Sequence, residues 1–84
     1  MDKQALIAKL KVIVKPYATN AEAYDKLDEN TDFIKDLNIN SANLVDIILD
    51  IEETFGVVIN NEEMERMLDV KTAMAIVETK LAAQ

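Results

Sequence analysis

The fold of this chain is decided by residues 41–55, which read SANLVDIILDIEETF. Apolar side chains recur there with the spacing of one helical face, and they are Leu44, Ile47, Ile48, Ile51 and Phe55. Gly56 follows at once, and glycine ends helices readily because it adopts a left-handed backbone conformation without a Cβ clash. The stretch therefore predicts a helix over residues 41–55 with one buried face.

A second helix is predicted over residues 2–15, where the apolar stripe consists of Leu6, Leu10, Ile13 and Tyr17. Pro16 is expected to end it, because the residue before a proline is disfavoured in the α region. Residues 18–40 have sparse apolar positions and are expected to form a long loop, within which Tyr24 to Glu29 can form a helical turn.

Two more helices are predicted after Gly56. Residues 57–59 read VVI, and because a lone strand has no sheet to join, they are expected to form an extended connector. Asn60 or Asn61 can cap a short helix through Met67, and Asp69 can cap a last amphipathic helix.

Length and composition favour one all-α domain. The chain has 84 residues, half of them apolar, with one glycine and one proline. We therefore expect a single domain over residues 1–84, built as a small four-helix bundle with three main helices, one short helix and a long first loop. The expected core comprises Leu6, Leu10, Leu44, Ile48, Ile51, Phe55, Ile59, Met64, Met67, Ile76 and Val77.

The chain contains neither cysteine nor histidine, which excludes many catalytic and metal-binding sites. Without cysteine, the chain has no disulfide, thiolate metal site or thiol nucleophile of its own. Without histidine, it lacks Ser-His-Asp triads, histidine metal sites and the usual general base at neutral pH. Most enzyme classes are therefore disfavoured, and any thiol must come from a cofactor.

Charge is distributed unevenly along the chain, whose net charge is −7. No basic residue occurs between Lys35 and Arg66, and residues 36–65 carry eight acids, so that the remaining nine bases and eight acids sum to +1. Such a segment repels nucleic acid and favours a protein partner with a basic patch. No signal sequence and no apolar run near 20 residues is seen, so we expect a cytoplasmic monomer without a membrane span.

Ser41 is the only serine of the chain and stands where the loop meets the predicted helix. An anion attached there would face the positive end of the helix dipole and unpaired backbone N–H groups, which stabilise phosphate. Taken alone, this position is better explained as an ordinary N-cap formed by Asn40 or Ser41.

Residues 36–42 read DLNINSA, and residues 52–59 read EETFGVVI. With the acidic helix between them, these motifs resemble the central region of acyl carrier proteins, which typically read D-L-G-x-D-S-L and later E-x-x-F-G-I-x-I. An acidic short helix and a final amphipathic helix follow in that family, as predicted here, and the resemblance covers most of residues 30–81.

The resemblance implies that Ser41 bears 4′-phosphopantetheine, because it matches the serine to which that family attaches the group. A separate phosphopantetheinyl transferase would add it from coenzyme A. Acyl groups would then be attached to the arm as thioesters and be delivered to acyl transferase, synthase or ligase enzymes. The chain would be a discrete carrier of fatty acid or polyketide type biosynthesis, and not an enzyme.

Three residues depart from the family motif around this serine. Asn40 and Ala42 replace Asp and Leu, which removes a charge and shrinks an apolar contact that partner enzymes usually touch. Asn38 replaces Gly, and Asn tolerates positive φ better than other non-glycine residues. We expect the turn to be retained, and the substitutions hint at a specialised pathway.

An acidic surface for basic docking patches is expected on the helix after Ser41. At 100° per residue, small and large apolar side chains fall outside the buried stripe beside carboxylates, and three nearby glutamates have no compensating base. The predicted partner-binding residues are Ala42, Val45, Asp46, Leu49, Asp50, Glu53, Glu62 and Glu63. The alternative is a solvated acidic face without a partner.

Rival interpretations remain at this point. Residues 28–32 and 36–40 imitate the opening of a calcium loop, but the required Gly and final Glu are missing, so an EF-hand is rejected and no metal site is expected. An acidic helical interaction module that never carries a cofactor would explain the charge, although not the serine motif. A hydrolase using Ser41 lacks any histidine as base.

Overall fold

The structure, a computed structural model, describes residues 2–83 and is all-α within that range. Its helices are α1 (Lys3–Val14), α2 (Ala21–Asp25), α3 (Ser41–Phe55), α4 (Asn61–Arg66) and α5 (Val70–Ala83). The predicted fold class is confirmed, with three long helices and the short α4 where the sequence indicated them. The additional short helix is α2.

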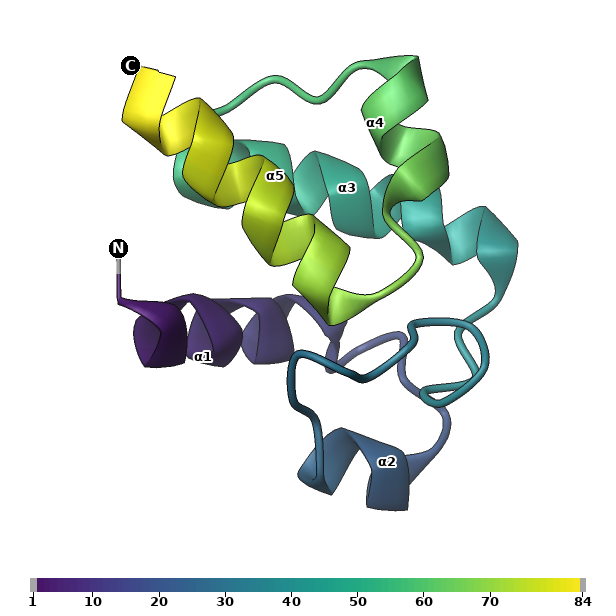
Figure 1. Cartoon of the computed structure of the whole chain (residues 1–84). Coiled ribbons are helices and arrows are strands. Elements are labelled where there is room, and N and C mark those ends of the chain that lie inside the picture. The colour runs from purple at the N-terminus through teal and green to yellow at the C-terminus, as the bar shows by residue number, and fades with distance from the viewer. Residues whose placement is uncertain (1, 84) are drawn as a thin grey trace.

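The long helices α1, α3 and α5 form the bundle, in which α1 packs against both α3 and α5 (Figure 1). The short helix α2 lies at the edge of the molecule, beyond the end of α1, and contributes no fully buried residue. Within residues 2–83, no helix combines the length and the apolar character that crossing a membrane requires.

The core contains the buried face predicted for α3, namely Ile47, Ile48, Ile51 and Phe55. Two residues expected in the core, Leu44 and Met64, are only half-buried and pack against its margin. The other expected core residues are buried.

The helix α1 ends at Val14, one residue before the predicted end. The expectation that Pro16 pushes Lys15 out of the α region is wrong, because Lys15 keeps φ −48° and ψ −48°. Its N–H still donates to the Lys11 carbonyl at 3.1 Å, and the Val14 carbonyl accepts from the N–H groups of Tyr17 and Ala18. These bonds close a final turn that requires a helical backbone at Lys15.

The long loop predicted over residues 18–40 contains more structure than the sequence indicated. The helical turn expected at Tyr24 to Glu29 is instead α2, which begins at Ala21, where the Asn20 side chain accepts the Ala23 N–H at 3.2 Å. Since α2 buries no residue completely, it has no apolar stripe by which a sequence pattern could reveal it.

The second half of this loop is fixed in the core. Its buried side chains are Leu27, Thr31, Phe33, Leu37 and Ile39. The Phe33 N–H donates to the Leu68 carbonyl and the Val70 N–H to the Thr31 carbonyl, both at 2.9 Å. The loop is therefore tied to the start of α5, far along the sequence.

The turn that precedes α3 depends on Asn38, which has φ +55° and is the only non-glycine residue with positive φ among residues 2–83. This confirms the expectation that Asn38 supplies the left-handed conformation. The Thr19 hydroxyl donates to the Asn38 carbonyl at 2.8 Å and holds the turn in place.

Replacing Asn38 tests this conformational requirement. We expect Asn38→Val to lower the free energy of unfolding by about 1–2 kcal/mol, because a β-branched residue strains the left-handed region. Asn38→Gly should be at least as stable as the parent chain. Urea unfolding followed by circular dichroism measures both.

The matched control for this substitution is Asn30→Val, at an exposed loop position without positive φ. It should change stability by less than about 0.5 kcal/mol. Equal losses in the two valine variants would contradict the conformational explanation.

Candidate functional site

Ser41 is the first residue of α3, and the N-cap before it is Asn40. The Asn40 side chain accepts the Ala42 N–H at 2.9 Å, and its carbonyl accepts the Asn43 N–H at 2.9 Å. Of the two N-caps that the sequence allowed, Asn40 is therefore the one used. The Ser41 hydroxyl is exposed and has no hydrogen-bond partner among residues 2–83.

The turn before Ser41 is built by two aspartates. The Asp32 carboxylate accepts the N–H groups of Ile34 and Lys35 at 2.9 and 2.8 Å. The Asp36 carboxylate accepts the Asp32 N–H at 2.7 Å. These are two of the acids that imitate a calcium loop, and both are used to close the turn. Within residues 2–83, no three acidic side chains are grouped to hold a metal ion.

The electrostatic surroundings of Ser41 suit an attached phosphate. The first turn of α3 contains no acidic residue, so a phosphodiester on Ser41 meets no like charge there. The dipole of a 15-residue helix points its positive end at this position. The Ala42 and Asn43 N–H groups already donate to Asn40, so the helix dipole and the exposure of the Ser41 hydroxyl are what fit a phosphopantetheine group.

The apolar part of the predicted partner-binding surface is exposed, as the helical projection indicated. Val45 is 48% exposed and Leu49 is 53% exposed, and Ala42 is also exposed. Residues at this spacing lie on one side of a helix, a turn apart. The outer side of α3 therefore carries an apolar strip that starts next to Ser41.

Carboxylates flank this strip on the side nearer to α1. Asp46 is exposed and Asp50 half-exposed. The pKa of Tyr17 is raised above its usual value by burial of the phenol and by the neighbouring carboxylates of Asp50 and Asp46. The two aspartates thus share their surroundings with Tyr17, which lies in the turn after α1 and which no sequence pattern linked to them. Glu53 is exposed at the far end of α3.

The two glutamates of α4 have different surroundings. Glu62 is exposed. Glu63 forms a capping box with Asn60, whose N–H it accepts at 3.0 Å, and an ion pair with Lys80 of α5 at 2.8 Å. The expectation that these glutamates lack a compensating base is wrong for Glu63, because the base arrives from a helix distant in sequence.

A structural carboxylate that the sequence pattern missed is Glu52. Its side chain accepts the Ile59 N–H at 2.7 Å, and its carbonyl accepts the N–H groups of Gly56 and Val57. Gly56 has φ +67°, as expected for the left-handed residue that ends α3. Glu52 thereby holds the connector beside the last turn of α3. The hydrogen bond joins residues seven positions apart in a non-helical connector, so no helical or strand periodicity in the sequence indicates it.

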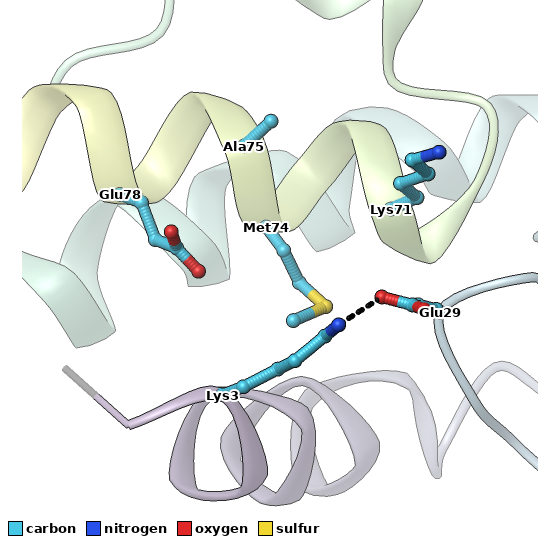
Figure 2. A pocket seen from close by; sticks show the side chains of 6 residues that line it. All are labelled: Lys3, Glu29, Lys71, Met74, Ala75 and Glu78. Atoms are coloured by element: carbon cyan, nitrogen blue, oxygen red, sulfur yellow. Dashed lines mark ion pairs between the residues drawn. The ribbon is translucent and has the colours of Figure 1, made fainter.

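A separate pocket of about 370 Å³ lies between the start of α1, the loop and α5 (Figure 2). Lys3 and Glu29 meet across its mouth at 2.6 Å, and this hydrogen-bonded contact raises the pKa of Lys3. The Lys71 N–H donates to the Glu29 carbonyl at 3.0 Å. Glu29 therefore connects α1 to α5, and the pocket is accounted for by this structural contact.

The sequence of this chain is similar to that of known proteins over most of its length. A family model described as "Phosphopantetheine attachment site" matches residues 19–79, which include Ser41 and all of α3 and α4. The acyl carrier protein of Coprothermobacter proteolyticus is 31% identical over 81 residues, which cover 96% of each chain. That of Petrotoga mobilis is 33% identical over 81 residues, 96% of this chain and 93% of that one.

A solved structure agrees with these relatives. The crystal structure of the acyl carrier protein from Thermotoga maritima matches with a TM-score of 0.77 at 30% identity. The match covers 99% of this chain and 94% of that chain. The similarity thus extends over the whole bundle and includes the helix that begins at Ser41.

The environment of Glu63 predicts acid sensitivity. The hydrogen bond from Lys80 and the backbone N–H of Asn60 lower the pKa of Glu63 from its usual 4.5. A lowered folded-state pKa stabilises the fold above the unfolded-state value, and this contribution is lost as pH falls through the folded-state pKa. We expect Glu63→Gln to be less stable than the parent chain at neutral pH, with a difference that shrinks in acid.

The measurement is urea unfolding at a series of pH values from neutral to below 4.5. Glu65→Gln, on the same helix but with an exposed side chain, is the control and should show no such pH-dependent difference. If Glu63→Gln lowers the free energy of unfolding by the same amount at every pH in this range, the assigned ion pair is contradicted.

Proposed function

Because this chain belongs to the acyl carrier protein family, we propose that Ser41 carries its 4′-phosphopantetheine arm. Phosphopantetheine is the cofactor of that family, whose members are carriers and not enzymes. The observation that carries the proposal is the exposed Ser41 hydroxyl, the only serine of the chain, at the start of α3 within the matched region.

The proposed modification has a simple balance of atoms. The Ser41 oxygen forms a phosphoester bond to the pantetheine phosphate of coenzyme A as the phosphoanhydride bond to the nucleotide half breaks. The hydroxyl proton passes to a base of the transferase, and the nucleotide half leaves as adenosine 3′,5′-bisphosphate. The phosphopantetheinyl transferase, a partner expected throughout the family, supplies the catalytic groups. When bound, the arm supplies the thiol that this cysteine-free chain lacks.

The residues of this chain position and shelter the modified oxygen. Asn40 fixes the first turn of α3 without adding negative charge beside the phosphodiester. Leu37 and Ile39, both fully buried, hold the preceding turn in the core and thereby limit the movement of Ser41. The arm would thus extend from a fixed point at one end of the bundle.

The proposal includes a docking surface for the acyl transferase, synthase or ligase enzymes that use the arm. It comprises Ala42, Val45, Asp46, Leu49, Asp50, Glu53 and Glu62, and it is supported by their exposure and by the absence of basic residues from 36–65. Glu63, predicted from the sequence to bind partners, contributes indirectly by capping α4. Basic patches on the partners would complement this surface.

The finer features of the function are part of the same proposal. The chain would work as a monomeric carrier over residues 1–84, supported by one hydrophobic core, and would serve fatty acid or polyketide type biosynthesis. Asn40 and Ala42, which depart from the usual motif, favour a specialised pathway over bulk fatty acid synthesis. Since the arm derives from coenzyme A, the proposed location is the cytoplasm.

Intact mass after incubation with coenzyme A and a broad-specificity phosphopantetheinyl transferase tests the attachment residue. We expect the parent chain to gain the mass of one phosphopantetheine group and Ser41→Ala to gain none. No mass gain on the parent chain would leave the unmodified interaction module as the explanation. A gain on Ser41→Ala would place the arm on another hydroxyl.

Charge reversal tests the docking surface. We expect Asp46→Lys to raise the KM of the chain for that transferase about three- to tenfold at low salt, because a rim charge opposes a basic patch. The effect should decrease at high salt as screening increases. Glu22→Lys makes the same charge change on α2 and should leave KM nearly unchanged; equal effects would indicate net charge alone.

A further inference from the structure

The connector between α3 and α4 exposes one valine to solvent. Val57 and Ile59 are each only 6% exposed, whereas Val58 between them is 77% exposed. Among the large apolar residues of 2–83, no other side chain is as exposed, and Val58 lies outside the partner-binding set that the sequence predicted. An extended backbone alternates its side chains, so burying both neighbours directs Val58 outward.

The position of this connector is fixed by Glu52. Three N–H groups, those of Gly56, Val57 and Ile59, donate to the Glu52 carbonyl or carboxylate at 2.9, 3.1 and 2.7 Å. The Val57 bond is the 6→1 bond of a Schellman turn, and the Gly56 bond is the 5→1 bond of the simpler αL motif. The backbone on both sides of Val58 is therefore fixed beside the last turns of α3 and needs no ordering when a partner binds.

A groove of about 500 Å³ runs between this connector and α3. It is lined by Leu49, Glu52, Glu53, Val57 and Val58. Leu49 belongs to the apolar strip that starts beside Ser41, so the groove continues the docking surface past the end of that strip. Glu53, which is exposed, contributes a carboxylate at its margin.

We propose that this groove is a second anchor point of the docking surface, which receives an apolar side chain of the partner enzyme while an adjacent Lys or Arg pairs with Glu53. The proposal rests on the function proposed above and identifies the contact that orients the partner. Apolar contact at Val58 and Leu49 supplies affinity, and the carboxylate selects a basic neighbour.

The charge of the surroundings determines the chemistry of the occupant. Residues 36–65 contain eight acids and no base, and the only ion pair formed by these acids among residues 2–83 is that of Glu63 with Lys80. An acidic or neutral partner would leave Glu53 uncompensated beside a desolvated apolar contact. A basic residue next to the inserted apolar side chain removes that cost.

The location of the groove gives it an orienting role. Leu49 lies eight residues after Ser41, which at the α-helical rise corresponds to about 12 Å along the axis. A partner held only near Ser41 could rotate about the arm, whereas contact at a second point fixes its rotation. The groove therefore controls which enzymes can align their active site with the arm.

The kinetic test compares two valines with the same substitution. Holo-protein is supplied to a ligase that loads fatty acid onto carrier proteins, and KM and kcat are measured for the parent chain, Val58→Thr and Val12→Thr. Val12 is 71% exposed on α1 and lies outside the docking surface. Neither change affects the core, and unfolding curves check that both variants fold as the parent does.

We expect Val58→Thr to raise KM about three- to tenfold with kcat within about twofold, as expected for loss of one apolar contact. Val12→Thr should change KM by less than about twofold. Equal KM values for the two variants, or a loss confined to kcat, would overturn the second anchor point.

A binding test on the unmodified chain keeps this inference separate from the attachment at Ser41. The isotope-labelled chain is titrated with a helical peptide carrying one Leu between two Arg on the same face, and amide shifts are mapped. Changes concentrated at Leu49, Glu53, Val57 and Val58, and lost in Val58→Thr, support the groove. Changes on α1, or diffuse changes, overturn it.

A second copy of the chain is the other occupant that this experiment resolves. Concentration-dependent shifts at the same residues in the absence of peptide would identify self-association and overturn the enzyme partner. A missing mass gain in the transferase assay would instead refute attachment of the arm, whatever the peptide titration shows.

Discussion

The rotation of α3 about its own axis is the constraint on which the rest of this structure depends. Burial of Ile47, Ile48, Ile51 and Phe55 fixes that rotation, because turning the helix would expose four large apolar side chains at about 1.5–3 kcal/mol each. Once the buried face is fixed, the opposite face is fixed too. Val45 and Leu49 must then face outward, on the same helix that starts with Ser41.

The position of Ser41 along the bundle depends on contacts outside α3. Leu37 and Ile39 hold the preceding turn in the core, and the left-handed Asn38 lets the chain reverse between them. The same loop is joined by backbone hydrogen bonds to the start of α5. Ser41, the proposed attachment point, therefore follows a loop that is anchored in the core and hydrogen-bonded to the start of α5.

The carboxylates of this acidic chain divide into two groups with different roles. Glu52, Glu63, Asp32 and Asp36 accept backbone N–H groups and hold turns or helix ends, so their charges are already used within the fold. Asp46, Glu53 and Glu62 are exposed and remain available to a partner. A count of acids overestimates the proposed docking surface, because it includes residues whose carboxylates hold turns and helix ends.

The sequence by itself determined the helical class, the limits of α3, the glycine at its end and the apolar strip beyond Ser41, because all of these are local or periodic features. It could also single out the one serine. Both Asn40 and Ser41 are residue types that cap helices, so the choice of Asn40 required the local structure. Only the tertiary structure decided that α2 exists without a buried stripe and that Lys80 neutralises Glu63. The tertiary structure also decided that Glu52 fixes the connector around Val58. Such contacts depend on how the helices and loops pack, and they produce no periodic pattern in the sequence.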